Sequence, residues 1–288
     1  MERLCLSHVF GFNTFRSLLV LATTCYLSVM EFSSYAQQIL ESEELEAKLS
    51  PPATPLTDEH ACEAPPPPEK PARTKRHAIT PRVKVPSPEG MPDPAQRVRI
   101  LHAFANHELQ AVEIFAWALL AYTDAPTAFR RGLIGILREE QRHFRLYEAR
   151  LQAHGCDFGD FPLSGYFWGK AQTLSTPLRF VCAMSLTFES ANLDHALDYA
   201  RRAKDVGDKE TAAVLLQIHD DEIGHVAFGW RWLREFKQAD QNAWQAFSEN
   251  LTFPLRPSKA KGPVFSEESR EKAGIDQAFI HRLRDARD

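Results

Sequence analysis

Four glutamates and two histidines are the residues of this sequence whose types and spacing could support chemistry. They form two Glu-x-x-His motifs and two single glutamates: Glu140 with His143, Glu222 with His225, Glu108 and Glu189. Side chains at positions i and i+3 lie on one face of a helix, so each motif can present a carboxylate and an imidazole to one ion or to two adjacent ions. Carboxylate oxygen and imidazole nitrogen suit iron or manganese.

The spacing between these residues makes the motifs more specific than either is alone. A single Glu-x-x-His is expected about once by chance in a chain of this length and composition. Here Glu140 follows Glu108 by 32 residues and Glu222 follows Glu189 by 33, so the two halves repeat. All six side chains interrupt apolar stripes, where an ionised carboxylate costs several kcal/mol unless a partner compensates its charge. We therefore expect the six residues to share a bound partner.

Four long helices are expected to carry these residues. Apolar side chains recur at steps of three and four in 97–122, 127–154, 178–204 and 209–236, and strand-like alternation is absent outside these segments. The first and third connections are short, whereas about twenty residues rich in aromatic side chains separate the second helix from the third. The sequence therefore predicts an all-α four-helix bundle over 94–238, with one long crossover between helices 2 and 3.

The segments that flank the predicted bundle differ from it in composition. Thirteen of the 19 prolines lie between Pro51 and Pro94, so 30–93 is predicted to form a short helix and a Pro-rich arm, and 239–288 a tail with a C-terminal helix. Segment 1–29 contains an apolar run that is too short for an ordinary membrane span. Three interpretations of 1–29 remain open: an upstream extension, a targeting segment such as a signal peptide, or a packed helix.

The sequence resembles the ferritin-like di-metal carboxylate superfamily and, within it, the uncharacterised bacterial domain-of-unknown-function family 455. Four segments carry the resemblance: NHELQAVE, LREEQRH, FESANLD and HDDEIGHVAFG. The resemblance runs from about Met30 through the fourth helix and into the tail. It implies a ferritin-like bundle holding two Fe ions, with Mn as the alternative. It also implies a role for each residue: Glu140 and Glu222 bridge the metals, Glu108 and Glu189 are terminal ligands, and His143 and His225 bind one metal each.

Two carboxylates compete with the predicted terminal ligands. Glu113 and Asp194 each lie five residues after one of them, about 140° around the helix, so each pair cannot share a face. Glu108 continues an apolar stripe, whereas Glu113 lies on a neighbouring face suited to contact another helix or the crossover. We therefore expect Glu108 to be the ligand on the first helix.

Other side chains near the motifs each allow two interpretations. Glu139 and Asp221 directly precede the motif glutamates, and either hold a ligand histidine by a hydrogen bond or face solvent. Tyr147 is either a hydrogen-bonding or redox-active tyrosine beside the centre or a core residue. Gly229 lies one turn beyond His225 and is expected to border an access channel. For the six residues themselves, the alternative is a metal-free salt-bridged network with Arg130, Arg138 or Arg142.

These features predict an oxidase or hydroxylase that activates O2 or peroxide and acts on an unknown small substrate. One alternative is a ferritin-like iron-binding or detoxification protein, although long arms at both ends would obstruct a closed cage. The other is a non-catalytic interaction protein with a vestigial site. We expect no cage but a small oligomer such as a homodimer.

The net charge and the cysteine content limit which partners and which cellular compartment the sequence favours. A net charge of -4 argues against nucleic-acid binding, and the basic run 70–84 is predicted to be a solvated linker, with an anionic partner as the alternative. Five cysteines without CxxC spacing favour a reducing compartment. We therefore expect a cytoplasmic protein without a membrane span, or an exported one if segment 1–29 is a signal peptide.

Overall fold

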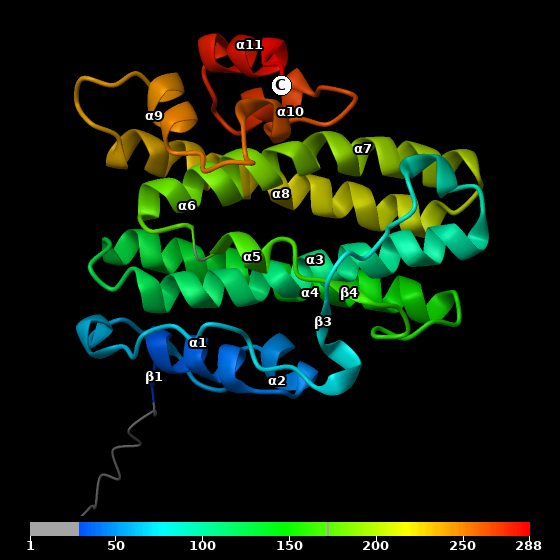
Figure 1. Ribbon diagram of the computed structural model, residues 1–288, viewed down its shortest axis with the longest axis horizontal. Helices are drawn as coiled ribbons and strands as arrows, with labels where there is room; N and C mark the ends of the chain where they lie inside the picture. Colours follow the sequence, from blue (N-terminus) through cyan, green and yellow to red (C-terminus); the bar gives the residue numbers. More distant parts are fainter. Residues whose placement is uncertain (1–28, 172) are drawn as a thin grey trace, which may run out of the picture.

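The computed structural model describes residues 29–171 and 173–288, and most of this chain is helical (Figure 1). The three interpretations of segment 1–29 concern residues that lie almost wholly outside the described range. Within that range, none of the helices has the length and apolar character needed to cross a membrane.

Two antiparallel pairs of long helices form the centre of the molecule. The first pair is α3 (Pro94–Ala121) with α4 (Thr127–Ala153), and the second is α7 (Ser190–Asp205) with α8 (Lys209–Phe236). The third long helix is composite, because α6 (Pro177–Ala183) continues through the π-helical segment η4 (Met184–Glu189) into α7. The predicted order of short connection, long crossover and short connection is confirmed.

The shorter elements cover the two outer faces of these pairs. In Figure 1, α1 (Phe32–Glu41) and α2 (Leu45–Leu49) lie against the α3/α4 layer, while α9 (Ala243–Glu249), α10 (Glu267–Lys272) and α11 (Gln277–Asp285) lie over the α7/α8 layer. The crossover contains α5 (Trp168–Ala171). Four 3-10 turns complete the helical elements of the described residues: η1 (Ala61–Glu63), η2 (Lys75–His77), η3 (Pro88–Gly90) and η5 (Pro257–Ala260).

Two pairs of very short parallel strands were not predicted. β1 (Met30–Glu31) pairs with β2 (Leu56–Thr57), and β3 (Ile79–Thr80) pairs with β4 (Leu163–Ser164). Each strand has two residues, which is too short to produce an alternating pattern in the sequence. The second pair attaches the Pro-rich arm to the crossover.

Local signals explain where the long helices begin. The side chain of Asp93 accepts a hydrogen bond from the amide of Ala95, with Pro94 in the first turn, so α3 starts slightly before the predicted 97. Thr176 and Asp208 cap α6 and α8 in the same way. At the C-terminal end, the single predicted helix is two helices, because Gly274 has a φ of 78° that interrupts helical geometry.

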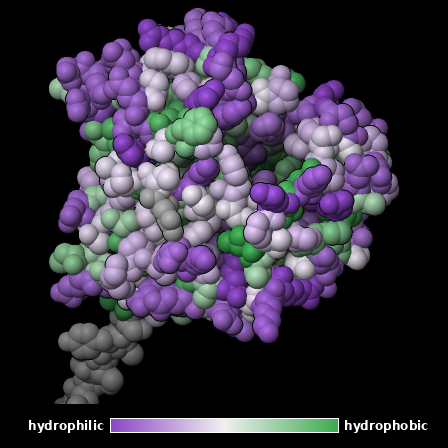
Figure 2. Space-filling model, in the orientation of Figure 1, coloured by the Kyte–Doolittle hydropathy of each residue, from purple (hydrophilic) through white to green (hydrophobic). Residues whose placement is uncertain are grey.

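The hydrophobic core extends beyond the predicted bundle at both ends. Tyr35 and Ile39 of α1 are buried in the same cluster as the α3 and α4 side chains, and so are Phe247 of α9 and Phe279 of α11. On the face shown in Figure 2, polar side chains cover most of the described surface and hydrophobic ones form small areas. The arms therefore pack as part of the fold and do not merely flank it.

The prediction that Gly229 borders an access channel is wrong. A Cβ atom at Gly229 would lie 2.3 Å from Cβ of Ser185 and 3.2 Å from Cγ of Leu186, both in η4. The glycine therefore lets α8 approach η4 closely. The contact packs α8 against the π-helical segment that ends at Glu189. Such π-helical turns often occur at functional sites.

We expect Gly229→Ala to lower the free energy of unfolding by about 1–3 kcal/mol, because the added methyl group overpacks this contact. Gly135→Ala is the matched control, since nothing lies within 4 Å of a Cβ at this exposed position of α4. The control should gain roughly 0.5–1 kcal/mol from better helix propensity. Denaturant unfolding measures both, and equal stability of Gly229→Ala and wild type would contradict the packing explanation.

Candidate metal centre

The structure brings together the six residues that the motifs single out. Ligand atoms of two overlapping groups each lie within 4.8 Å of one another, and all six side chains are buried. Glu140 and Glu222 belong to both groups, which consist of Glu108, Glu140, His143 and Glu222, and of Glu140, Glu189, Glu222 and His225. The two groups therefore share two carboxylates, and each adds one further carboxylate and one histidine.

Each long helix supplies the side chains that its sequence predicts. Glu108 extends from α3 and Glu189 from the end of η4, while α4 and α8 supply the two Glu-x-x-His motifs. Nδ1 of His225 lies 2.9 Å from a carboxylate oxygen of Glu222 and 3.1 Å from one of Glu140. The δ nitrogens therefore face the carboxylates at the centre.

Several buried polar atoms at the centre lack the hydrogen bonds that burial normally requires. Neither carboxylate oxygen of Glu140 nor Nδ1 of His143 makes a hydrogen bond of good geometry within the described residues, although Nδ1 of His225 lies 3.1 Å from Oε1 of Glu140 and Nδ1 of His143 lies 3.5 Å from Oε2. Such orphaned atoms are rare in protein interiors and call for a ligand. Because they are carboxylate oxygens and an imidazole nitrogen, the donor set fits two iron or manganese ions.

Glu139 and Asp221 hold the two histidines from the outside. Nε2 of His225 lies 2.8 Å from Oε2 of Glu139, and Nε2 of His143 lies 3.1 Å from Oδ2 of Asp221. The arrangement is crosswise, because each carboxylate belongs to the opposite motif helix. A carboxylate that accepts the Nε2 proton favours the neutral tautomer in which Nδ1 can bind a metal ion. Of the two interpretations, the geometry favours the histidine-holding one.

We expect Asp221→Asn to weaken metal binding by about ten- to a hundredfold, since outer carboxylates of this kind raise the basicity of the ligand imidazole. Asp220→Asn is the matched control, because Asp220 is exposed and contacts His219 instead. Competition of the purified protein with a chelator of known affinity measures the effect. Equal affinities of Asp221→Asn and wild type would contradict the assigned role.

The pKa shifts at the centre differ between the glutamates that belong to one ligand group and Glu140, which belongs to both. Burial, reinforced by the neighbouring Glu140, raises the pKa of Glu108, and burial with the nearby Glu222 raises that of Glu189. For Glu140, burial is outweighed by the two imidazoles, which lower its pKa. For His143, burial is outweighed by the carboxylates around it, chiefly Asp221, which raise its pKa to about 9. The centre therefore concentrates negative charge that a cation would stabilise.

Glu113 and Asp194, the competing carboxylates, point away from the centre and anchor the two arms. Oε1 of Glu113 lies 3.2 Å from Nζ of Lys48 and accepts a hydrogen bond of 3.0 Å from Nε of Arg73. Asp194 receives two bonds from Arg270, at 2.8 and 3.0 Å. All five side chains are buried or nearly so. This geometry favours Glu108 over Glu113 and Glu189 over Asp194 as ligands.

The alternative arginine network does not occur among the described residues. Arg130 pairs with Asp58, and Arg142 binds Asp221, so neither makes an ion pair with the six central residues. No ion pair of Arg138 is found there either. Tyr147 is buried against Phe104, at 5.5 Å between ring centroids, and its pKa is raised by burial and by Glu108.

A cavity of about 380 Å³ reaches the centre from the side of α3 and α7, with Glu108 and Glu189 in its lining. Burial lowers the pKa of His107 to about 4 and also lowers that of His195, so both histidines of this cavity are neutral at pH 7. From the sequence, both were interpreted as ordinary surface or hydrogen-bonded histidines on other faces of their helices. The motif analysis missed Asn192, whose Nδ2 donates to Oε1 of Glu222 at 3.1 Å, although its i+3 spacing from Glu189 could have identified it.

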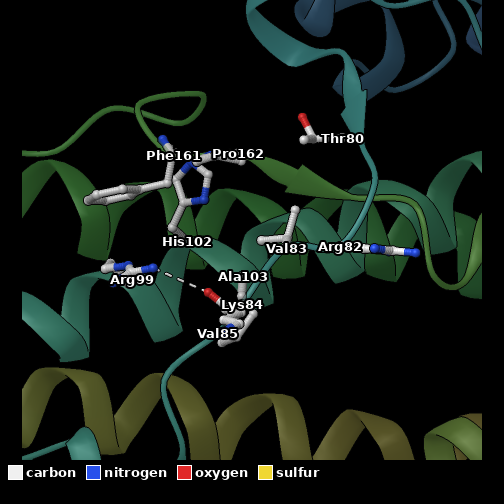
Figure 3. A pocket seen from close by; sticks show the side chains of 10 residues that line it. All are labelled: Thr80, Arg82, Val83, Lys84, Val85, Arg99, His102, Ala103, Phe161 and Pro162. Atoms are coloured by element: carbon white, nitrogen blue, oxygen red, sulfur yellow. Dashed lines mark hydrogen bonds between the residues drawn. The ribbon is translucent and has the colours of Figure 1, made fainter.

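The predicted basic run lines a different cavity, of about 290 Å³, that lies away from the centre (Figure 3). Lys84 and Arg82 of the arm border it together with Arg99 and His102 of α3. Arg99 donates to the backbone oxygen of Lys84 at 3.2 Å, as the dashed line in Figure 3 shows. The run is an ordered part of the arm that contacts α3, and most of its residues are exposed, as expected for a solvated linker.

Comparison with known proteins places the chain among relatives whose descriptions state no activity. The family model described as "Protein of unknown function (DUF455)" matches residues 28–281. An uncharacterized protein of Haemophilus influenzae is 27% identical over 186 residues, which make up 62% of this chain and 64% of that protein. The chain thus matches less than two thirds of that relative's length. No solved structure matches the chain.

Proposed function

The chain belongs to the family of proteins of unknown function DUF455, and we propose that it is a ferritin-like dinuclear metal enzyme, an oxidase or hydroxylase. Iron is the proposed metal, and manganese is the alternative that the same ligands suit. The observation that carries the proposal is the buried pair of overlapping ligand groups that share Glu140 and Glu222. The two helical pairs and the long crossover support the ferritin-like assignment.

The side chains of the centre would have different roles in binding two ions. Glu140 and Glu222 lie between the two groups, so they are placed to bridge, while Glu108 and Glu189 close the two ends. Glu139 and Asp221 would accept the Nε2 proton of each histidine, so that Nδ1 could bind a metal ion. When bound, two iron ions supply the redox and Lewis-acid chemistry that activates O2 or peroxide.

The cavity at the centre favours an enzyme over an iron store. It leads to the terminal carboxylates Glu108 and Glu189, and rings such as Phe104 and Phe188 form its walls. An apolar cavity with a few polar groups is the usual form of a site for small organic molecules. In addition, the arms cover the outer faces of both helical pairs, which fits a small oligomer better than a cage (Figure 1).

Anaerobic titration with Fe(II), followed by exposure to O2, tests this function. We expect iron binding to saturate at about two ions per chain and O2 to oxidise both, because the ligand set provides two positions. Glu140→Ala should bind fewer than one ion per chain. Glu148→Ala is the control on the same helix, since Glu148 pairs with Arg145 instead. Continued uptake and oxidation far beyond two equivalents would indicate iron storage instead.

A further inference from the structure

The cavity beside the centre is built by two facing helix surfaces. Phe104, His107 and Glu108 follow one another at helical spacing on α3, and Asn192, His195 and Tyr199 do so on α7. The crossover adds the rings of Tyr166 and Phe167. The half-exposed Tyr166 therefore lies at the rim, while Glu108 lies at the buried end.

Aromatic rings line the cavity on several sides and are mutually oriented by edge-to-face contacts. Phe104 meets Tyr199 at 4.8 Å between ring centroids, and Phe167 meets Phe188 at 4.7 Å, both nearly perpendicular. His107 meets Phe167 in the same way at 4.8 Å. Rings held in this manner present both faces and edges to a further ring placed between them. An aromatic ligand therefore gains edge-to-face and stacking interactions that an aliphatic ligand of the same size does not.

The polar groups of the cavity suit an uncharged ligand, because the proposed function assigns the carboxylates Glu108 and Glu189 to the metal ions and leaves two histidines and one lysine to face the ligand. His107 and His195 have no hydrogen-bond partner among the described residues, so each can donate to or accept from a bound molecule. Lys259, the one cation among the described lining residues, pairs with Asp288 at 3.0 Å. An anionic ligand would therefore have to compete with this ion pair.

We infer that the cavity binds an uncharged aromatic molecule of one or two rings that carries a hydrogen-bonding substituent. The rings contact the aromatic walls, and the substituent bonds His107 or His195. The cavity volume of about 380 Å³ lies in the range of small-molecule sites. This inference names the substrate class of the proposed enzyme, and to that extent it rests on the proposed function.

Calorimetric titration of the full-length protein under anaerobic conditions tests the inference with three probes of the same size. β-Naphthol has the ring system and the hydroxyl group, its fully saturated analogue has only the hydroxyl group, and β-methylnaphthalene has only the rings. We expect β-naphthol to bind about tenfold more tightly than the saturated analogue and about fivefold more tightly than β-methylnaphthalene. Equal or tighter binding of the saturated analogue would overturn the inference.

Variants locate the binding site without depending on activity. Phe188→Leu should weaken binding of β-naphthol about fivefold, whereas Phe161→Leu, the same change in the cavity of Figure 3, should leave it unchanged. His195→Leu should weaken binding of β-naphthol about fivefold but not that of β-methylnaphthalene. Unchanged affinity of Phe188→Leu, or equal losses in both phenylalanine variants, would contradict this site.

Metal content of the same samples separates this inference from the proposed function. Protein that holds two metal ions but lacks the aromatic preference would refute the substrate class and leave the dinuclear function standing. Protein that binds β-naphthol as expected but holds no more than a trace of metal would refute the dinuclear function and leave the aromatic site standing.

Discussion

Glu108→Gln is expected to reduce the metal content of the protein, whereas Glu113→Gln should destabilise the fold and leave the metal content per folded chain near that of wild type. Glu108 lies in a ligand group with Glu140 and Glu222, so its amide would remove one negatively charged ligand oxygen. Glu113 instead compensates the buried charges of Lys48 and Arg73. Removing one partner of a buried ion pair costs about 3–5 kcal/mol, because the other charge stays uncompensated.

Metal analysis and denaturant unfolding of both variants measure this pair of effects. We expect Glu108→Gln to lose metal and keep its stability, and Glu113→Gln to lose stability and keep its metal. Asp194→Asn provides a second test of the same logic, because Asp194 pairs with Arg270 as Glu113 pairs with Lys48 and Arg73. A loss of metal in Glu113→Gln comparable with that in Glu108→Gln would refute the assignment of Glu108.

Metal should stabilise the folded protein substantially. Without a cation, the buried carboxylates of the centre repel one another, and burial keeps the pKa values of Glu108 and Glu189 raised. A ligand that binds only the folded state adds about 4 kcal/mol at a free concentration a thousandfold above its dissociation constant. For a chain of this size, we expect the melting temperature to rise on the order of 10 °C.

Thermal melts of metal-free and reconstituted protein at neutral pH measure this effect. Glu222→Ala is the control, because loss of a shared carboxylate should remove most of the metal-dependent rise. Equal midpoints for metal-free and reconstituted wild type would contradict a metal site in the interior of the bundle.

The main helices and the central residues could be predicted because their signals are local. Helical periodicity and the caps at Thr176 and Asp208 define the helices, and i to i+3 spacing puts each motif on one face. The choice of Glu108 over Glu113 followed from the apolar stripe and from the spacing in the superfamily that the motifs resemble. Burial alone could not decide it, because α3 is buried on most sides and Glu113 contacts Lys48 of α2. The metal-binding roles themselves stay predictions.

Features that depend on contacts between distant segments could not be predicted. The crosswise pairing of Glu139 with His225 depends on how α4 and α8 are offset. The π-helical segment packs closely against Gly229, a residue 40 or more positions away in the chain. The cavity likewise requires the crossover to place Tyr166 and Phe167 beside α3 and α7, and no periodic pattern in that loop indicates this.

The metal content of the wild-type protein after reconstitution with Fe(II), combined with location of the ions by anomalous scattering, tests the central claim most directly. Our account predicts two ions per chain, both between α3, α4, α7 and α8, with Glu140 and Glu222 contacting both. Only trace iron and manganese after reconstitution, or ions bound elsewhere in the molecule, would contradict it.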